Sequence, residues 1–386
     1  MSIALREDAV GLYLHIPFCE RVCHFCAFVT RGFRDERAAS FVKDLIAEIR
    51  LYREMQALRG RVIETIYVGG GTPTTLTGDQ LGGILQACRD AFQVDRAAEI
   101  TIEANPSSID GPLLEMLLRA GCNRLSLGAQ SFEIDELASL GSSHTPVQIE
   151  MAVRLARQIG FRNLNLDLMY GLPGQSLERL LANIKSAVAL EPEHLSFYNL
   201  TIEEGTRFAR DAAAGHLVLP SHDLVAEMFE RGRSTLEAAG YLQYEVSNFA
   251  RAGFACRHNL GYWTDREWLG LGLSSHSYLD GERFSNVESL EEYHHCLLRE
   301  TLPVAAREEM NNDLRLREAI AFGLRQVKGV ELAPLERRYG VSPLKRFRTP
   351  IAQATSAGWL EIQGASLRPT RLGLVFADSL GLAFIE

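Results

Sequence analysis

The sequence contains no apolar run long enough to cross a membrane, because no stretch reaches the roughly 18 residues that a span requires. The first ten residues, MSIALREDAV, lack both a basic start followed by an apolar stretch and a cleavage site. Gly and Pro, at 32 and 13 of 386 residues, are too few for a low-complexity chain. We therefore expect a folded, cytoplasmic protein, although loose membrane association through a partner would leave no trace in these patterns.

Positive charge is also scarce. Lys and Arg number 40 against 49 Asp and Glu, and no basic stripe runs along the chain, so nucleic acid is not an expected partner. The seven cysteines are an odd number with three of them packed into eight residues, which argues against a disulfide framework. Clustered thiols favour a metal site, whereas the isolated Cys88, Cys122 and Cys296 are expected in the core.

Short β-branched segments alternate with amphipathic stretches over the first 200 residues. Strands are predicted at 12–16, 65–70, 99–104, 124–130, 163–170 and 194–200, and helices at 40–53, 77–91, 112–120 and 177–190. This alternation predicts an α/β fold with a parallel sheet and right-handed crossovers. Six such units predict a partial (β/α)6 TIM-like barrel, short of the eight that close a full one.

We assign residues 1–200 to the barrel core, after which the composition and pattern of the sequence change twice. Residues 201–304 are rich in aromatics, His and Gly, and we expect them to close the mouth of the barrel. In 305–386, helices at 313–326, 332–339 and 343–357 precede a hairpin at 359–370 and a last helix. This outline predicts a C-terminal winged-helix-like α+β domain, for which packing is favoured over DNA binding because a basic recognition face is absent.

The segment HIPFCERVCHFC follows the first predicted strand and places Cys19, Cys23 and Cys26 in a Cys-x3-Cys-x2-Cys loop. Three thiolates at this spacing can bind three irons of a [4Fe-4S] cluster and leave the fourth iron open. Structural zinc usually takes four protein ligands, and ferredoxins supply a fourth Cys, both at other spacings. The open iron suits the amine and carboxylate of S-adenosylmethionine (SAM). Apolar residues of the loop would shelter the cluster: Phe18, Val22, Phe25 and Phe28.

Flexible or polar residues close four of the predicted strands, at the edge where parallel strands end: Gly70, Gly71, Thr72, Glu103, Gln130 and Asp167. Glycines there allow a ligand to approach the backbone amides, which suits a carboxylate or an ammonium group, although a plain tight turn explains them equally well. The three later side chains can accept hydrogen bonds from a ribose or an amine. Each of the three could instead cap the helix that follows it.

Eight segments, taken in order, resemble the oxygen-independent coproporphyrinogen III oxidase-like family of radical SAM proteins, and most of all its heme-chaperone branch. They are HIPFCERVCHFC, YVGGGTPT, ITIEANP, RLSLGAQSF, NLDLMYGLPGQ, HLSFYNLTIE, QYEVSNFA and CRHNLGYW, and the resemblance covers nearly the whole chain from about residue 11. It implies a radical SAM barrel in which the cluster-bound SAM contacts Tyr13, Gly70, Glu103 and main-chain groups near Phe25, Gly71 and Thr72.

Two positions depart from the oxidase pattern. The oxidase has a further Cys two residues beyond the triad, and Phe28 stands there in this chain, which argues against coproporphyrinogen oxidation. Gln130 and Asp167 match positions that line a second SAM in the oxidase. Ser142, however, replaces an Arg that the family usually has before the His of LGSSH, so the resemblance leaves open whether a second SAM binds.

The HNLGYW segment at 258–263 resembles an HNxxYW motif that is linked to heme binding in the chaperone branch. A His such as His258 can be an axial ligand to heme iron while Tyr and Trp cover the macrocycle. Cys256 is an alternative thiolate ligand. A loop whose His and aromatics only close the barrel mouth would explain the same residues.

Two kinds of function share this cluster site. The favoured one is a heme chaperone that binds heme and passes it to an acceptor hemoprotein, with the cluster and SAM in a regulatory or assembly role. The alternative is a radical SAM enzyme of the same family, a methyltransferase or cyclopropanase, and coproporphyrinogen III dehydrogenase is less favoured. Either would use a reductant such as flavodoxin or ferredoxin. No catalytic residue is assigned.

Overall fold

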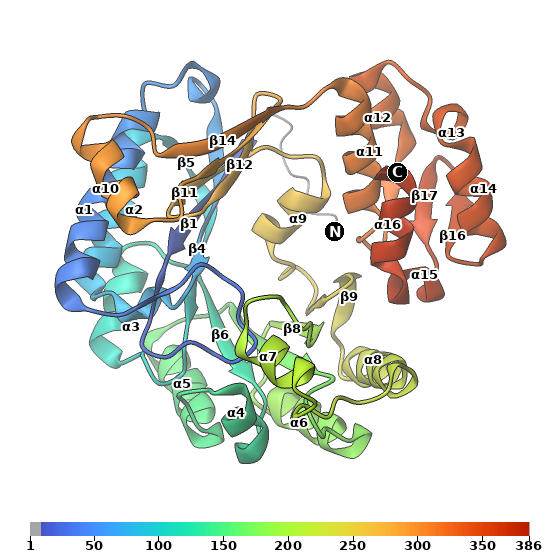
Figure 1. Cartoon of the computed structure of the whole chain (residues 1–386), viewed down its shortest axis with the longest axis horizontal. Helices are drawn as coiled ribbons and strands as arrows, with labels where there is room; N and C mark the ends of the chain where they lie inside the picture. Colours follow the sequence, from blue (N-terminus) through green and yellow to red (C-terminus); the bar gives the residue numbers. More distant parts are fainter. Residues whose placement is uncertain (1–8, 386) are drawn as a thin grey trace.

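The computed structural model describes residues 9–385, so the first eight residues, which bear on the expected absence of a targeting segment, lie outside the described residues. Six parallel strands form the centre of the protein (Figure 1): β1 (Ala9–Ile16), β4 (Val62–Gly70), β5 (Gln93–Ala104), β6 (Arg124–Gln130), β7 (Leu164–Tyr170) and β8 (His194–Asn199). Each contains one of the six predicted strands almost entirely. The predicted α/β class and parallel sheet are therefore confirmed.

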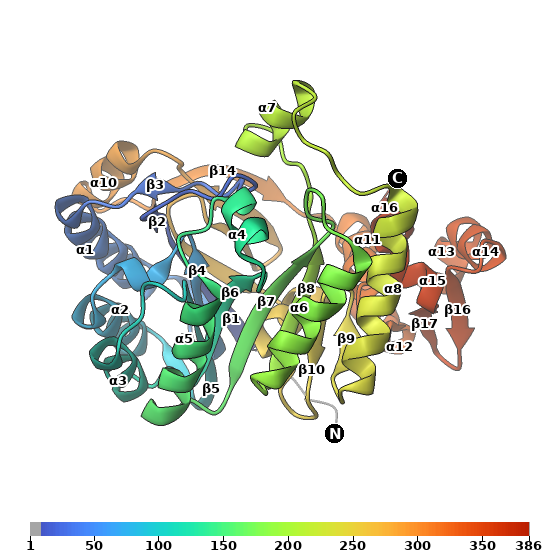
Figure 2. The same cartoon turned by 90° about the horizontal axis from the view of Figure 1, so that it is seen from below.

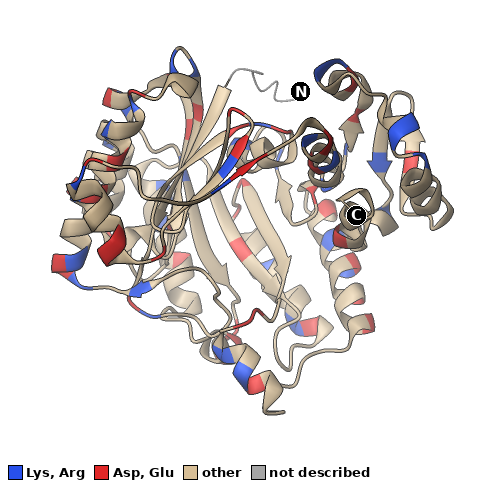
Figure 3. Cartoon of the chain, turned by 45° about the horizontal axis from the view of Figure 1, so that its top comes forward, with Lys and Arg blue, Asp and Glu red and all other residues tan. Residues whose placement is uncertain are grey.

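Helices cover the outer face of these strands (Figure 2): α1 (Asp35–Tyr52), α2 (Gly78–Ala91), α3 (Gly111–Arg119), α5 (Pro146–Ile159), α6 (Leu177–Ala189) and α8 (His222–Ala238). The starts of α2 and α5 are well specified by sequence, because Thr77 and Thr145 each form a capping box with a Gln three residues later. Outward side chains of the strands, such as Leu125 and Leu166, are fully buried beneath the helices. Figure 3 shows both signs of charge interspersed over the helices.

The sheet extends beyond these six strands to twelve, in the order β14-β13-β12-β11-β1-β4-β5-β6-β7-β8-β10-β9. The added strands are β9 (Leu242–Glu245), β10 (Asn248–Ala250), β11 (Trp268–Gly272), β12 (His276–Leu279), β13 (Glu282–Asn286) and β14 (Val304–Glu309). β11 runs parallel to β1, whereas the others pair antiparallel. The aromatic-rich segment therefore lengthens both edges of the sheet, which its short strands of three to six residues did not reveal in the sequence.

Shorter elements connect the sheet to its surroundings: β2 (Phe18–Cys19), β3 (Arg31–Gly32), α4 (Ile134–Leu140), α7 (Arg207–Ala213), α9 (Arg257–Trp263) and α10 (Leu290–Leu298). Of the isolated cysteines, Cys88 and Cys122 are buried as expected, but Cys296 on α10 is only half-buried, so that prediction is wrong for Cys296. Within residues 9–385, no helix combines the length and the apolarity that crossing a bilayer requires.

The C-terminal residues build a second body with its own hydrophobic cluster, on the far side of α9 from the central strands (Figure 1). Its helices are α11 (Asn312–Gly323), α12 (Leu332–Tyr339), α13 (Pro343–Arg346), α14 (Arg348–Ser356), α15 (Arg371–Val375) and α16 (Ala377–Ile385), and its sheet is β15 (Val330–Glu331), β17 (Ser366–Pro369) and β16 (Leu360–Gln363). The single helix expected at 343–357 is interrupted at Phe347, whose buried ring packs against Phe384.

The inner face of the parallel strands is polar. Alternate residues point to opposite faces of a strand, and on the inward face these are Thr65, Tyr67, Glu99, Thr101, Glu103, Arg124, Ser126, Asn165, Asp167, His194 and Ser196. Hydrogen bonds join several of them, such as Asn165 Nδ2 to Ser126 Oγ at 2.7 Å and His194 Nδ1 to Asn165 Oδ1 at 2.6 Å. The barrel interior is therefore lined by polar, hydrogen-bonded side chains and is not a hydrophobic core.

Candidate cofactor site

The cysteine loop begins and ends on one short pair of strands. Cys19 closes β2 and is 8% exposed, and β2 pairs with β3 so that the loop returns to its start. Cys23 and Cys26 lie half-buried between the two strands. Burial, followed by the neighbouring Cys26 and Cys19, raises the pKa of Cys23 to about 12. The three sulfurs therefore lie close enough to influence one another, and holding them as thiolates requires a cation at this place.

This donor set suits a multi-iron cluster better than a single ion. Within residues 9–385, no three or more His, Cys, Asp and Glu side chains are grouped closely enough to hold one metal ion. All seven cysteines are free. Three thiols are the ligand number of an open [4Fe-4S] cluster, whereas a structural zinc site usually takes four protein ligands. Of the apolar residues expected to shelter the cluster, Val22 and Phe28 are 46% and 65% exposed, so that expectation is wrong for these two.

His24, between two of the cysteines, anchors the loop to the rest of the barrel. Its backbone N–H donates to Leu140 O at 2.9 Å, its Nδ1 lies 2.8 Å from Ser139 O, and its carbonyl accepts from Phe208 N at 2.9 Å. Gly141 makes room for the imidazole, because a Cβ there would lie 2.7 Å from the ring. Sequence reasoning missed His24, because its partners are more than a hundred residues away.

The GGGTP turn after β4 packs directly on the cysteine loop. Gly71 N donates to Ile16 O at 2.8 Å, and a Cβ on Gly71 would lie 2.6 Å from Phe18 O and 3.1 Å from Cys19 Sγ. Gly70 has φ +107°, which a side chain would strain. The Thr72 hydroxyl lies 3.6 Å from Cys19 Sγ. These glycines therefore allow a close approach to the cysteine loop, beyond what a plain tight turn requires.

Glu103 reaches from β5 to the same turn. Its Oε2 accepts from Gly70 N at 3.1 Å and its Oε1 from the Tyr67 hydroxyl at 2.7 Å. Burial raises the pKa of Glu103 to about 7, and these two hydrogen bonds oppose the rise. The carboxylate thus lies at the carboxyl end of its strand, beside the cysteine loop, where it can accept a further hydrogen bond from an amine.

Gln130 and Asp167 line the interior beside Glu103, but they differ in position. Gln130 ends β6 with φ +64° and accepts from the Tyr198 hydroxyl at 2.6 Å. Asp167 was expected to close its strand; it lies in the middle of β7, where Asn165 Nδ2 donates to it at 2.7 Å, and burial raises its pKa. The N-cap residues of the helices after these strands are Asp110, Glu133 and Ser176, so none of the three predicted side chains serves as a cap.

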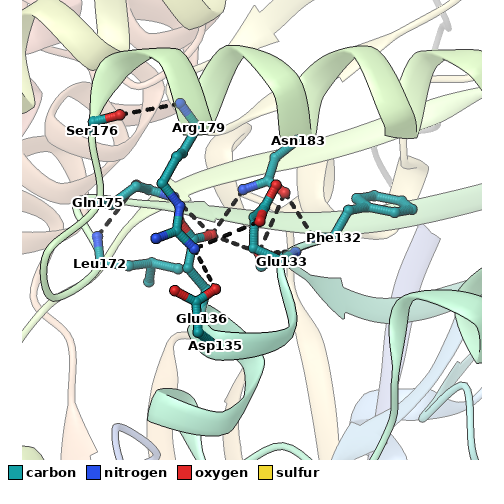
Figure 4. Close-up of polar contacts among 10 residues, drawn as sticks. Phe132, Glu133, Asp135, Glu136, Leu172, Gln175, Ser176, Arg179 and Asn183 are labelled. Atoms are coloured by element: carbon teal, nitrogen blue, oxygen red, sulfur yellow. Dashed lines mark hydrogen bonds and ion pairs between the residues drawn. The ribbon is translucent and has the colours of Figure 1, made fainter.

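A buried polar network holds the chain that follows Gln130 (Figure 4). The Oε2 of Glu136, which is 3% exposed, accepts from Ser131 Oγ at 2.6 Å, Asn183 Nδ2 at 2.8 Å and Gln175 Nε2 at 3.2 Å, and Arg179 Nε lies 3.3 Å from its Oε1. The Oδ1 of Asn183 also accepts from Phe132 N at 2.7 Å. One carboxylate therefore ties the turn after β6 to the start of α6 and to the loop after β7.

His258 lies inside the barrel, whereas we had expected it at the mouth. Its ring is 4% exposed, with Nδ1 at 2.8 Å from Thr65 Oγ1 and Nε2 at 2.9 Å from the Tyr262 hydroxyl. Thr65 lies four residues before Gly69 on β4, so α9 packs about 13 Å below the glycine turn, toward the amino ends of the strands. The expectation that this part of 201–304 closes the mouth is wrong.

Glu99 on β5 positions the start of α9. Its carboxylate accepts from the backbone N–H groups of Arg257 and His258, both at 3.1 Å, and from Cys256 Sγ at 3.4 Å. An acidic side chain at a helix start satisfies N–H groups that otherwise lack partners. Sequence reasoning missed Glu99, although its place two strand periods before Glu103 puts both on the same face.

The chemistry of α9 favours an imidazole over a thiolate as a ligand. Burial, and then the Arg124 charge, lower the pKa of His258 to about 3, so the ring is neutral near pH 7, which is the form that binds metal. Burial raises the pKa of Cys256 to about 12, which disfavours its thiolate. The Tyr67 ring stacks on His258 with 5.2 Å between centroids, and its hydroxyl donates to Glu103. The Tyr67 ring therefore lies between His258 and Glu103, which is beside the cysteine loop.

Comparisons with known proteins agree with this arrangement. The family model of the Radical SAM superfamily matches residues 13–187, and that of the HemN C-terminal domain matches residues 303–376. The chain is 33% identical to the heme chaperone HemW of Bacillus subtilis, over 97% of this chain and 98% of that protein, and 37% identical to HemW of Mycobacterium tuberculosis, over 96% and 93%. The structure of coproporphyrinogen III oxidase (HemN) from Escherichia coli, at 24% identity, superposes with a TM-score of 0.85 over 98% of this chain and 90% of that one, which shows a shared fold.

Proposed function

This chain belongs to the HemN-like family of the radical SAM superfamily, in which it groups with the HemW heme chaperones, and from this premise we propose that it binds heme and delivers it to acceptor hemoproteins. Membership of the superfamily implies a [4Fe-4S] cluster and SAM. The observation that carries the heme proposal is the neutral imidazole of His258, held in the HNLGYW helix one ring away from Glu103.

We propose that Cys19, Cys23 and Cys26 hold the cluster, and that SAM lies against Tyr13, Gly70, Glu103 and main-chain groups near Phe25, Gly71 and Thr72. Two observations support this. The glycine turn packs closely on Cys19 because it carries no side chain there, and the Glu103 carboxylate accepts a hydrogen bond from the same turn. Gln130 and Asp167 line the adjoining interior, where the rest of SAM or a second SAM would lie. When bound, the cluster and SAM would supply one-electron chemistry, and this chain's residues would orient SAM beside the cluster.

The remaining assignments are proposals of the same kind. We propose three parts, 1–200, 201–304 and 305–386, and a reductant such as flavodoxin or ferredoxin for the cluster. A cytoplasmic location is supported by the seven free cysteines, which suit a reducing compartment.

Heme binding is tested at His258. We expect anaerobically reconstituted protein to bind heme in about a one-to-one ratio, and His258→Ala to weaken binding at least tenfold with a changed Soret band, because the axial ligand is lost. His216→Ala removes an exposed imidazole and should bind like the wild type, as should Cys256→Ser. Unchanged heme affinity and spectra in His258→Ala would reject His258 as the ligand. If only Cys256→Ser weakened binding and changed the Soret band, the thiolate of Cys256 would be favoured instead.

SAM affinity should depend on pH through Glu103. The ionised carboxylate binds the ligand amine with its charge and two acceptor oxygens, whereas the protonated acid has neither the charge nor the second acceptor. Its pKa is raised to about 7, so affinity should rise with pH through 7 and fall by up to about tenfold per pH unit below that pKa. The titratable or charged groups that face it are Tyr13, Cys19, Cys26, Tyr67, Arg124, Asp167, Tyr198 and Tyr262.

The measurement is calorimetric titration of cluster-loaded protein with SAM between pH 6 and 8, repeated in buffers of different ionisation enthalpy to count released protons. Glu103→Gln should bind SAM more weakly at pH 8 and lose the pH dependence. An identical pH profile in the wild type and in Glu103→Gln would show that another group titrates.

A further inference from the structure

The carboxylate of Glu48 on α1 is fully buried, at 0% exposed, and it holds the end of β11. Its Oε2 accepts from the backbone N–H of Gly272 at 2.7 Å and from the Tyr293 hydroxyl at 2.6 Å. Its Oε1 accepts from Asn286 Nδ2 at 2.6 Å. Four elements that are distant in sequence, α1, β11, β13 and α10, therefore meet at one side chain.

This carboxylate lies beside the strand from which the cysteine loop continues. In Figures 1 and 2, α1 and α10 lie side by side, and α1 packs on β11. β11 runs parallel to β1, so the carboxyl ends of the two strands point to the same side of the sheet. β1 ends at Ile16, three residues before Cys19. The residue that fixes the end of β11 is thus one strand away from the candidate cofactor site.

The end of β11 packs directly on His15 of β1. Gly272 and His15 pair in the register of the two strands, and Gly272 has φ +92°. A Cβ on Gly272 would lie 2.5 Å from His15 O, so β11 can approach this closely only without a side chain. The backbone of His15 is therefore in contact with the residue that Glu48 holds.

The His15 ring joins three parts of the candidate cofactor site. Its Nε2 lies 3.1 Å from Val29 O in the cysteine loop, and its Nδ1 lies 3.1 Å from the Tyr13 hydroxyl. Burial lowers the pKa of His15, so the ring is neutral near pH 7. Because a carbonyl only accepts hydrogen bonds, Nε2 carries the proton and Nδ1 accepts from Tyr13. The ring also fills the space beside Gly70, where a Cβ would lie 2.5 Å from it.

We propose that Glu48 is a positioning residue for the SAM site, an inference that rests on the proposed cofactor assignment. Glu48 holds Gly272, and Gly272 supports the backbone of His15. The His15 ring in turn orients the Tyr13 hydroxyl and the turn at Gly70, both of which we assign to SAM. Because Glu48 is fully buried, it acts through the strand and not by contact with SAM.

The test is SAM titration of the full-length, cluster-loaded protein, with the electron paramagnetic resonance spectrum of the reduced cluster recorded with and without SAM. Glu48→Gln keeps the shape of the side chain but places an NH2 group among three hydrogen-bond donors, so at least one bond is lost. It should weaken SAM binding about fivefold and alter the spectral change that SAM produces, with unchanged iron content. Tyr293→Phe removes one hydroxyl and should shift both readouts the same way by a smaller amount.

Glu245→Gln is the matched control. Glu245 is also a buried carboxylate, at 1% exposed, and it accepts from Asn248 Nδ2 and from Ser247 N. It lies on β9, however, which is the last strand at the other edge of the sheet. Its replacement should lower the free energy of unfolding in urea by a comparable amount and leave SAM binding and the spectrum unchanged. Equal effects of the two substitutions on SAM would show that lost stability is the cause.

A double substitution tests whether Glu48 acts through His15. His15→Gln alone should weaken SAM binding about tenfold, because both ring contacts are lost. If Glu48 acts through this ring, adding Glu48→Gln to His15→Gln should cause little further loss. Independent effects would multiply instead.

The outcomes separate this inference from the proposed function. If the cluster-loaded wild type binds no SAM, the SAM assignment fails and the positioning role fails with it. If it binds SAM, and Glu48→Gln and Tyr293→Phe bind as the wild type does, the assignment stands and the positioning role is rejected. Losses that multiply in the double variant also reject it. A loss that is absent in Glu245→Gln and does not add to that of His15→Gln would support it, and Tyr293→Phe decides if Glu48→Gln does not fold.

Discussion

Cys19→Ala is expected to abolish the [4Fe-4S] signal of the anaerobically reconstituted protein. Cys19 is the most buried of the three clustered thiols, at 8% exposed, and it lies against Gly71 and Thr72 where the turn meets the loop. Without it two thiols are left for a cluster that needs three, and the new Ala offers no donor. Iron and sulfide content, together with electron paramagnetic resonance of the reduced protein, measure the loss.

Cys296→Ala is the matched control, because it removes a half-buried free thiol on α10 and should leave the iron content unchanged. Two results would contradict the ligand set. One is an intact four-iron signal in Cys19→Ala. The other is a single zinc ion, and no iron, in the wild-type protein prepared without oxygen.

Glu136→Ala should lower the free energy of unfolding by about 3–5 kcal/mol. The substitution leaves Arg179 Nε, Asn183 Nδ2 and Gln175 Nε2 without the carboxylate they share in the network of Figure 4. Buried polar groups that lose their partner cost far more than the net worth of the original bonds. Urea unfolding followed by fluorescence and circular dichroism measures the change.

Glu133→Ala is the matched comparison, because Glu133 contacts the same Arg179 at 3.7 Å from a side chain that is 41% exposed. An exposed pair of this kind contributes at most about 1 kcal/mol. Equal destabilisation by the two substitutions would show that Glu136 is not the centre of the network. Because the network holds the turn after Gln130, Glu136→Gln should also weaken SAM binding more than Glu133→Gln does.

The parallel core was predictable because each of its signals is local. The strand at 124–130 was predicted with its observed bounds, since Leu125, Leu127 and Ala129 alternate with polar residues or glycine between two helical stretches. The helices at 177–190 and 332–339 were likewise close to their observed bounds, Leu177–Ala189 and Leu332–Tyr339. The edge strands at 242–286 were missed because three to five residues carry too little periodicity to detect.

Site residues divide in the same way. The spacing of three cysteines predicted the candidate ligands Cys19, Cys23 and Cys26. Their place after a predicted strand indicated Gly70 and Gly71. Tyr67, Glu99 and His24 carry no such mark in the sequence, because each acts through a partner far along the chain. Glu99 meets His258 across 159 residues, and Thr65 meets it across 193.

By itself, then, the sequence determined the alternation of strand and helix, the three thiols and the family to which the chain belongs, because these depend on residues within one loop or one turn of each other. Only the tertiary structure decided that His258 lies deep under Tyr67 and not at the mouth, and that the Tyr262 hydroxyl meets its Nε2. Strand register and the packing of α9 set those positions, and both depend on contacts between distant segments that no local pattern encodes.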